Sequence, residues 1–150
     1  MPYEEKHNII SLFSLVLISI PYLGHVFTRY AAEVLTTSQQ EITFWVTAIL
    51  IVIPIRIVAE IIGHIIMAII SAVLTGKDDL DTKTDERDHM IYLYSSRNSY
   101  IAFAIVVASG LTAMLVNPSI SLFFAIMLIG GTIVECVEIA SKAIMYRMSS

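Results

Sequence analysis

A long apolar run from Phe44 to Leu74 constrains the fold of this chain more than any other feature. About 20 apolar residues already cross a bilayer, so a helix of this length must tilt, protrude or bend, and Pro54 predicts a bend because it removes a backbone donor. The run carries Arg56, Glu60 and His64 at a spacing of four, which places them on one helix face. A charge near the middle of a membrane costs roughly 2.5 to 3.5 kcal/mol on insertion scales. These three side chains are therefore predicted to face the protein interior and to have partners there.

The composition places the whole chain in the membrane class. Of the 150 residues, 57% are hydrophobic, the mean hydropathy is +0.78, and the apolar residues occur in long runs. A soluble domain of this size cannot bury so much apolar surface. The chain is therefore predicted to be one all-α membrane domain, residues 1–150, folded as a four-transmembrane-helix bundle. The predicted spans are Ile9–Phe27, Phe44–Leu74, Ser99–Val116 and Ile120–Met145, with a cytoplasmic loop over residues 75–98. Within this loop a helix capped by Thr84 is predicted to run from Asp85 into the third span.

The distribution of basic residues predicts the orientation of the bundle. Arg29 is the one basic residue in the first predicted loop, and the turn at residues 117–119 has none. The N-terminus, the central loop and the C-terminal end hold seven: Lys6, Lys77, Lys83, Arg87, Arg97, Lys142 and Arg147. Under the positive-inside rule, both termini and the central loop are predicted to lie in the cytoplasm and the protein in the inner membrane.

The net charge of −4 comes largely from the central loop. Its acidic residues outnumber its bases: Asp78, Asp79, Asp81, Asp85, Glu86 and Asp88. This balance argues against nucleic acid as a partner and against a basic patch that binds anionic lipid headgroups. The predicted partner of the four spans is the lipid bilayer itself.

Polar residues in and after the first span predict how it packs and where the second begins. Ser11, Ser14, Tyr22 and His25 lie on one side of the first span, and this side is predicted to face the bundle because hydroxyls hydrogen-bond across helices better than they face lipid. The segment 28–42 is polar enough for a loop, and residues 31–35 predict a short external helix within it. Thr37-Ser38 is predicted to cap the start of the second span, with Glu41 three residues after Ser38 at the spacing of a capping box.

The last two spans are joined only by Asn117-Pro118-Ser119. They are therefore predicted to form a tight antiparallel hairpin with Ser119 as the cap of the fourth helix. Gly130 and Gly131 permit a close approach by a neighbouring helix. We expect this notch to serve a homodimer, because four spans alone offer little lateral area.

The second and fourth spans share a short pattern. Residues 60–67 and 138–145 both have the order acid, Ile, any, small, basic, any, Ile, Met. Such matches also arise by chance in apolar sequence, but they favour a tandem duplication of a two-helix hairpin whose halves have the same orientation. At about 1.5 Å per residue from the outer end of each helix, Glu60 and Glu138 are then predicted at the same depth.

Ionisable residues of the second and fourth spans are predicted to form one connected intramembrane cluster, with the arginine held between carboxylates: Arg56, Glu60, His64, Glu135 and Glu138. Two interpretations remain open, because the cluster could be a structural ion-pair network or a site that handles protons or cations. No metal site is predicted, because Cys136 faces away from Glu138 on the helix. The sequence contains no nucleophile with a base at recognisable spacing, no Gly-rich phosphate loop and no zinc-protease motif, so no enzyme and no cofactor are expected.

A distinctive pattern leads into the third span: Asp85-Glu86-Arg87-Asp88, followed by Arg97-Asn98 and Tyr100. Together with the Glu60 and His64 pair and with Tyr146-Arg147, it resembles a family of small four-span bacterial and archaeal membrane proteins of unknown function. The resemblance covers roughly residues 57–147. Lys142 departs from the family pattern, which has a more neutral residue there.

The resemblance implies no activity. It makes the residues of this cytoplasmic motif a second candidate site: Asp85, Glu86, Arg87, Asp88, Arg97 and Asn98. Families of this kind often accompany small helix-turn-helix regulators, which implies a cytoplasmic protein partner. The alternative function is therefore a regulatory or scaffold membrane subunit that presents residues 77–98 to a soluble protein.

Overall fold

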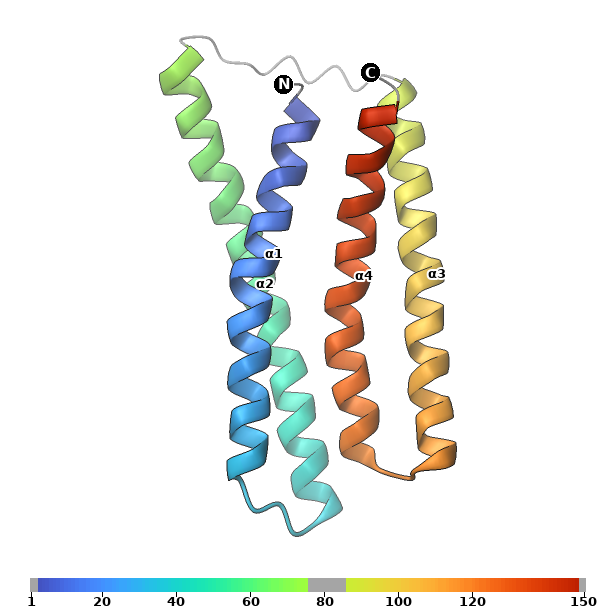
Figure 1. The fold of residues 1–150 in the computed structure, drawn as a ribbon. Coiled ribbons are helices and arrows are strands. Elements are labelled where there is room, and N and C mark those ends of the chain that lie inside the picture. Colours follow the sequence, from blue (N-terminus) through green and yellow to red (C-terminus); the bar gives the residue numbers. More distant parts are fainter. Residues whose placement is uncertain (1–2, 76–85, 149–150) are drawn as a thin grey trace.

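The computed structural model describes residues 3–75 and 86–148, and these form four α-helices: α1 (Tyr3–Ala32), α2 (Ser38–Thr75), α3 (Glu86–Val116) and α4 (Ile120–Met148). Each helix is long and apolar enough to cross a membrane. The helices run alternately up and down, so both ends of the chain lie at one end of the bundle, here called the terminal end (Figure 1). The two short connections lie at the opposite end, here called the loop end. The predicted all-α four-helix membrane fold is confirmed.

The helices extend beyond the predicted spans. α1 continues to Ala32 and α2 already begins at Ser38, so the separate external helix predicted between them is wrong. The residues predicted to start that helix instead continue α1, because nothing between 28 and 32 breaks the helix. α3 begins at Glu86, so the helix predicted to lead from the central loop into the third span is confirmed over residues 86–98. Acidic side chains in that first turn are favoured by the helix dipole.

The capping box that starts α2 lies one residue earlier than predicted. Thr37, not Ser38, is the cap, because its carbonyl accepts from the backbone N–H of Gln40 at 2.9 Å and of Glu41 at 3.2 Å. The Gln40 side chain reaches back to the backbone N–H of Thr37 at 3.3 Å and of Thr36 at 3.0 Å. Glu41 is left to accept a hydrogen bond from Ser121 of α4 at 2.7 Å.

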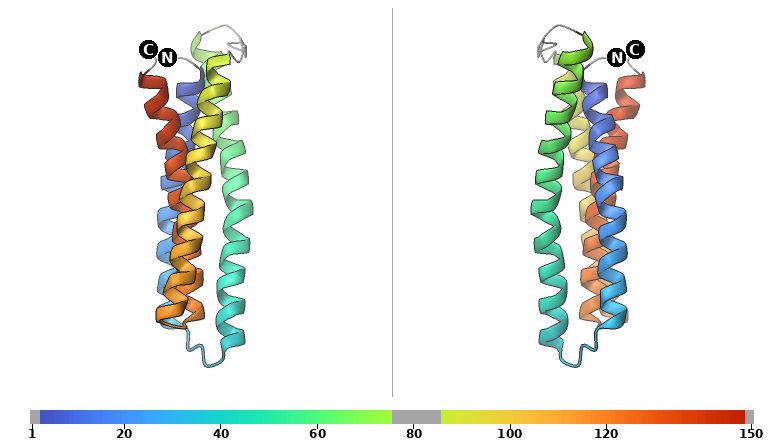
Figure 2. Two further views of the ribbon diagram at one scale, coloured as in Figure 1. Left: turned by 90° about the vertical axis from the view of Figure 1, so that its right-hand side faces the viewer. Right: turned by 90° about the vertical axis from the view of Figure 1, so that its left-hand side faces the viewer.

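α4 is the helix that holds the bundle together. It forms an antiparallel hairpin with α3 and also packs against α1 and α2. The hairpin was predicted, and Ser119 caps α4 by accepting from the backbone N–H of Leu122 at 3.2 Å. Across the described ranges α2 and α3 make no backbone approach to each other. Figure 2 shows the result, with α2 standing to one side of the other three helices.

The interior of the bundle is polar over much of its length. The buried polar side chains are Asn8, Ser11, Ser14, Ser19, Ser95, Ser99 and Ser121. A smaller apolar cluster at the loop end is built on Val26, Trp45, Ala48 and Leu128. Large aliphatic side chains are exposed along all four helices, where lipid would cover them. Hydroxyl and amide contacts therefore hold these helices together, as is typical of membrane bundles.

The Gly130 notch is filled within the chain itself. A Cβ atom at Gly130 would lie 2.1 Å from Cγ1 of Val106, so α3 packs directly onto the backbone of α4 there. A Cβ atom at Gly131 would meet nothing within 4 Å. The close helix approach that the two glycines predict is thus the α3–α4 contact, and the homodimer stays a prediction that loses this support.

Candidate functional site

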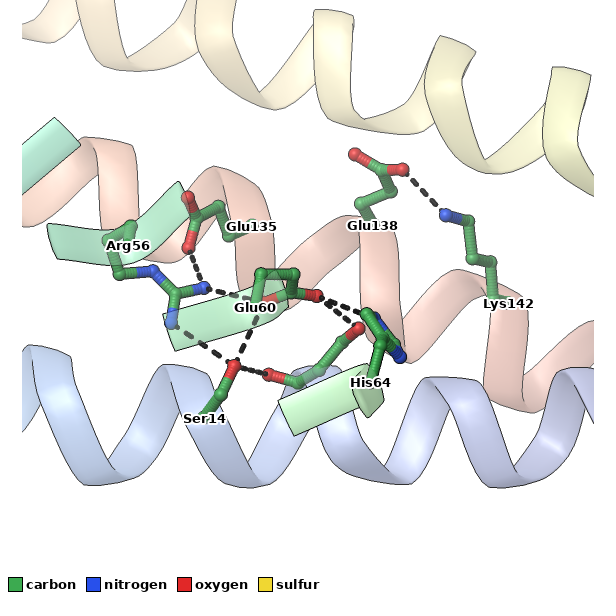
Figure 3. Close-up of polar contacts among 8 residues, drawn as sticks. Ser14, Arg56, Glu60, His64, Glu135, Glu138 and Lys142 are labelled. Carbon is green, nitrogen blue, oxygen red and sulfur yellow. Dashed lines mark hydrogen bonds and ion pairs between the residues drawn. The ribbon is translucent and has the colours of Figure 1, made fainter. Parts of the chain in front are cut away.

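Arg56 is the centre of a polar network inside the bundle. Its side chain is 13% exposed, and its Nη2 donates to Glu135 Oε2 of α4 at 2.7 Å. The same nitrogen lies 3.9 Å from Glu60 Oε2, one turn further along α2. Arg56 therefore lies between two carboxylates that come from different helices (Figure 3).

Two serines of α1 complete the surroundings of Glu60. Ser14 Oγ donates to Glu60 Oε2 at 2.9 Å, and Ser11 Oγ donates to Glu60 Oε1. Arg56 Nη1 in turn donates to Ser14 Oγ at 3.4 Å. α1 is positioned for this by its buried serine face, so both oxygens of Glu60 accept from hydroxyls while Arg56 supplies the positive charge.

His64 extends the network toward the terminal end. Its Nε2 lies 3.6 Å from Glu60 Oε1, one turn further along α2. We call these six residues the Arg56 network: Ser11, Ser14, Arg56, Glu60, His64 and Glu135. Because α2 rises about 1.5 Å per residue, the network spans about 12 Å along the helix from Arg56 to His64.

Glu138 does not join the Arg56 network, contrary to the prediction of one connected cluster. Its Oε1 accepts from Lys142 Nζ at 2.8 Å, and Figure 3 shows its carboxylate pointing toward α3 and away from Arg56. Lys142 also lies over the ring of Tyr92 of α3, 5.2 Å from the ring centroid. The physical reason is rotation: Glu135 and Glu138 differ by about 60° around α4, so they face different neighbours.

The shared pattern of α2 and α4 has a structural counterpart. Glu138 forms an ion pair with Lys142 four residues further on, and Glu60 lies 3.6 Å from His64 at the same spacing. α2 and α4 run in the same direction, and the Arg56 contact with Glu135 sets their register. Glu60 and Glu138 therefore lie at nearly the same level, although they face different ways.

A cavity of about 340 Å³ lies on the loop-end side of the Arg56 network. Residues from all four helices line it, including Ser19 and Tyr22 of α1 and Thr132 of α4. Arg56 and Glu135 form its polar end, and Glu135 is 46% exposed. Most of the remaining lining is aliphatic. Tyr22 does not offer its hydroxyl proton to the cavity, because it donates to the carbonyl of Ala48.

The described part of the predicted cytoplasmic motif contacts α4 through two of its side chains. Asp88 Oδ1 accepts from the hydroxyl of Tyr146 at 3.1 Å, and Asn98 Nδ2 donates to Ser141 Oγ at 3.2 Å. Arg97 is exposed and lies 5.1 Å from the ring centroid of Tyr94 on its own helix. Glu86 and Arg87 are exposed, and Asp85 lies outside the described residues.

Sequence reasoning missed several of these contacts. Asn8 Nδ2 donates to the carbonyl of Ile139 at 3.0 Å, and no partner was predicted for this side chain. Ser11 and Ser14 were predicted to face the bundle, and both are buried there, but Glu60 was not named as their acceptor. Recurring small polar residues at helical spacing along α1 were the pattern that pointed to this face. His25 of the same set is exposed instead, although Val26 next to it is buried in the apolar cluster at the loop end.

Among the described residues, no three His, Cys, Asp or Glu side chains form a group that could hold a metal ion, and Cys136 is exposed. No family model, curated protein or solved structure matches this chain.

Proposed function

We propose that the Arg56 network binds and transfers a proton or a small cation within the membrane. The observation that carries this proposal is the charge of the network. One guanidinium lies between two carboxylates, so Arg56, Glu60 and Glu135 together carry a formal charge of +1 − 2 = −1 when both acids are ionised. An uncompensated charge inside a membrane is unfavourable, and one added proton or cation would cancel it.

A purely structural network would not need this excess acid. The nearby Glu138 and Lys142 pair of α4, by comparison, has one charge of each sign and no excess acid. The Arg56 network instead combines two carboxylates with His64, and imidazole is the side chain that most readily gains and loses a proton near neutral pH. Arg56, Glu60 and His64 follow one another along α2 from the cavity toward the terminal end, and a proton relay needs such a row of ionisable groups.

The test is proton flux through proteoliposomes that contain the purified protein. An imposed potassium diffusion potential should drive acidification, measured with a pH-sensitive dye trapped inside. Glu60→Gln should abolish this flux, because it removes the carboxylate that links Arg56 with His64. Glu138→Gln is the matched control and should retain it, because Glu138 pairs with Lys142 instead. Full flux in Glu60→Gln, or none in the native protein, would contradict the proposal.

We further propose that the terminal end faces the cytoplasm of a prokaryotic cell. The support is the excess of basic residues in the sequence at the termini and central loop, because the ends of the described helices that adjoin these segments all lie at the terminal end (Figure 1). In a Cys136→Ser background, Thr37→Cys should react with an impermeant maleimide on intact cells. Ser150→Cys should react only after the cells are opened. Reaction of the cysteine introduced at position 150 in intact cells would show that the protein has the opposite orientation.

The scaffold alternative and the family resemblance both depend on the cytoplasmic motif. The exposed side chains of Glu86, Arg87 and Arg97 would be the contact points for a soluble partner. The inward contacts of Asp88 and Asn98 favour this function less, since those two residues are used to hold α3 against α4.

A further inference from the structure

The cavity beside the Arg56 network opens sideways toward lipid. Three residues that line it are also about half exposed on the outer surface: Ile53 and Ile57 of α2 and Phe103 of α3. Ser19 and Leu128, which line it too, are buried. The mouth therefore lies in the interval between α2 and α3, the two neighbours that do not pack on each other, and the deep wall lies on α1 and α4.

The walls and the far end of this cavity differ in chemistry. From the level of Ile49 to that of Arg56 the cavity runs about 10 Å along α2, with mainly aliphatic side chains on the way. At its polar end the guanidinium of Arg56 is largely enclosed and already bound to Glu135 at 2.7 Å. The exposed group at that end is the carboxylate of Glu135. Together with Arg56 and Glu60 it has a net negative formal charge when both acids are ionised.

We infer that this cavity binds an organic cation with an apolar body, which enters from the lipid between α2 and α3 and places its charge at Glu135. The inference rests on the proposed function, of which it names the cation class. An apolar body suits the aliphatic walls and the lipid-facing mouth, where a hydrated inorganic ion would lose its water. The rings of Phe103 and Tyr22 line the same space, and aromatic faces attract organic cations.

The size of the cavity fits this class of ligand. A volume of about 340 Å³ falls at the lower end of the range for small-molecule sites. One face also has unused room, because a Cβ atom at Gly131 would meet nothing within 4 Å and Gly131 lines the cavity. A larger side chain at this position would therefore occupy the space without displacing a neighbour.

Equilibrium dialysis of the purified protein in detergent tests the inference with two probes of matched shape. Tetraphenylphosphonium is a bulky apolar cation, and tetraphenylborate has nearly the same shape with the opposite charge. We expect saturable binding of the cation and none of the anion above the binding to empty micelles. Glu135→Gln and Gly131→Leu should each weaken cation binding by about tenfold, the first by removing the charge and the second by filling the space.

Glu138→Gln is the matched control and should bind the cation as the native protein does. Each variant is compared at equal helical content and monodisperse elution, so that loss of fold is not mistaken for loss of binding. Equal binding of both probes, no saturable cation binding, or a Gly131→Leu variant that binds normally would overturn the inference. If the Arg56 network binds protons, as proposed above, cation binding should weaken as the pH falls, because protons then compete for the same carboxylates.

The pH series separates the two hypotheses. Saturable cation binding that does not change with pH supports the cavity site and argues against a proton site in the Arg56 network. Proton flux in proteoliposomes without tetraphenylphosphonium binding overturns the cavity site and leaves the proposed function standing.

Discussion

Replacing Arg56 by Leu is expected to lower the free energy of unfolding by about 3 to 5 kcal/mol, the usual loss when one partner of a buried ion pair is removed. Glu60 and Glu135 would then face each other's charge without the guanidinium that now lies 3.9 and 2.7 Å from them. The measurement is unfolding of the protein in mixed micelles by added dodecyl sulfate, followed by far-ultraviolet circular dichroism.

Two further variants show whether the loss comes from charge. Val58→Leu changes an exposed side chain on the same helix and should have little effect. Combining Arg56→Leu with Glu60→Gln and Glu135→Gln should restore much of the lost stability, because a buried network without charges no longer needs a counterion. If Arg56→Leu unfolds at the same dodecyl sulfate fraction as Val58→Leu, the guanidinium does not stabilise the bundle by neutralising Glu60 and Glu135.

Gly130→Ala is expected to destabilise the bundle by about 1 to 3 kcal/mol through overpacking. The new Cβ atom would lie 2.1 Å from Cγ1 and 2.9 Å from Cγ2 of Val106. Valine in a helix has one strongly preferred rotamer, so it cannot turn aside, and α3 would have to move away from α4. The same dodecyl sulfate titration measures the effect.

Gly131→Ala is the natural comparison, because it makes the same change one residue further on. No atom lies within 4 Å of its added methyl group, and alanine is the better helix former by about 1 kcal/mol, so stability should be equal or slightly higher. Val106→Ala combined with Gly130→Ala should recover part of the loss. Equal effects of the two glycine substitutions would mean that the α3–α4 contact is looser than the structure has it.

The course of the helices could largely be predicted from local sequence, but their ends could not. Pro118 and Ser119 leave few ways to join two apolar runs, and the hairpin follows. At the start of α2 two overlapping capping boxes fit the sequence equally well, one from Thr37 and one from Ser38. The contact of Glu41 with Ser121, far away in the chain, accompanies the first of them, and no local pattern contains that contact.

The candidate site was predictable to the level of which residues need partners. Hydropathy alone shows that Arg56 and Glu60 cannot face lipid, but it does not say which acid of α4 forms an ion pair with Arg56. Glu135 and Glu138 are three residues apart, and the choice depends on how α4 is rotated between α2 and α3. Lys142, one turn beyond Glu138, forms an ion pair with it. This i,i+4 contact within α4 competes with the predicted contact between Glu138 and Arg56 of α2.

The central place of α4 has a consequence for how the bundle assembles, since α4 follows its three packing partners in the chain and is synthesised after them. Before it is inserted, α1 and α2 can already bring Arg56, Glu60 and the two serines together, with one charge of each sign. The α1–α2 hairpin can therefore lie in the bilayer before α4 is inserted, because the charges of Arg56 and Glu60 are paired. α3 has no such earlier packing partner, because the helix that it packs against in the described structure is α4. The packing of α3 is thus completed only after α4 is inserted, and until then the hydroxyls of Ser95 and Ser99 can donate to the carbonyls of Tyr92 and Ser96 within α3 itself.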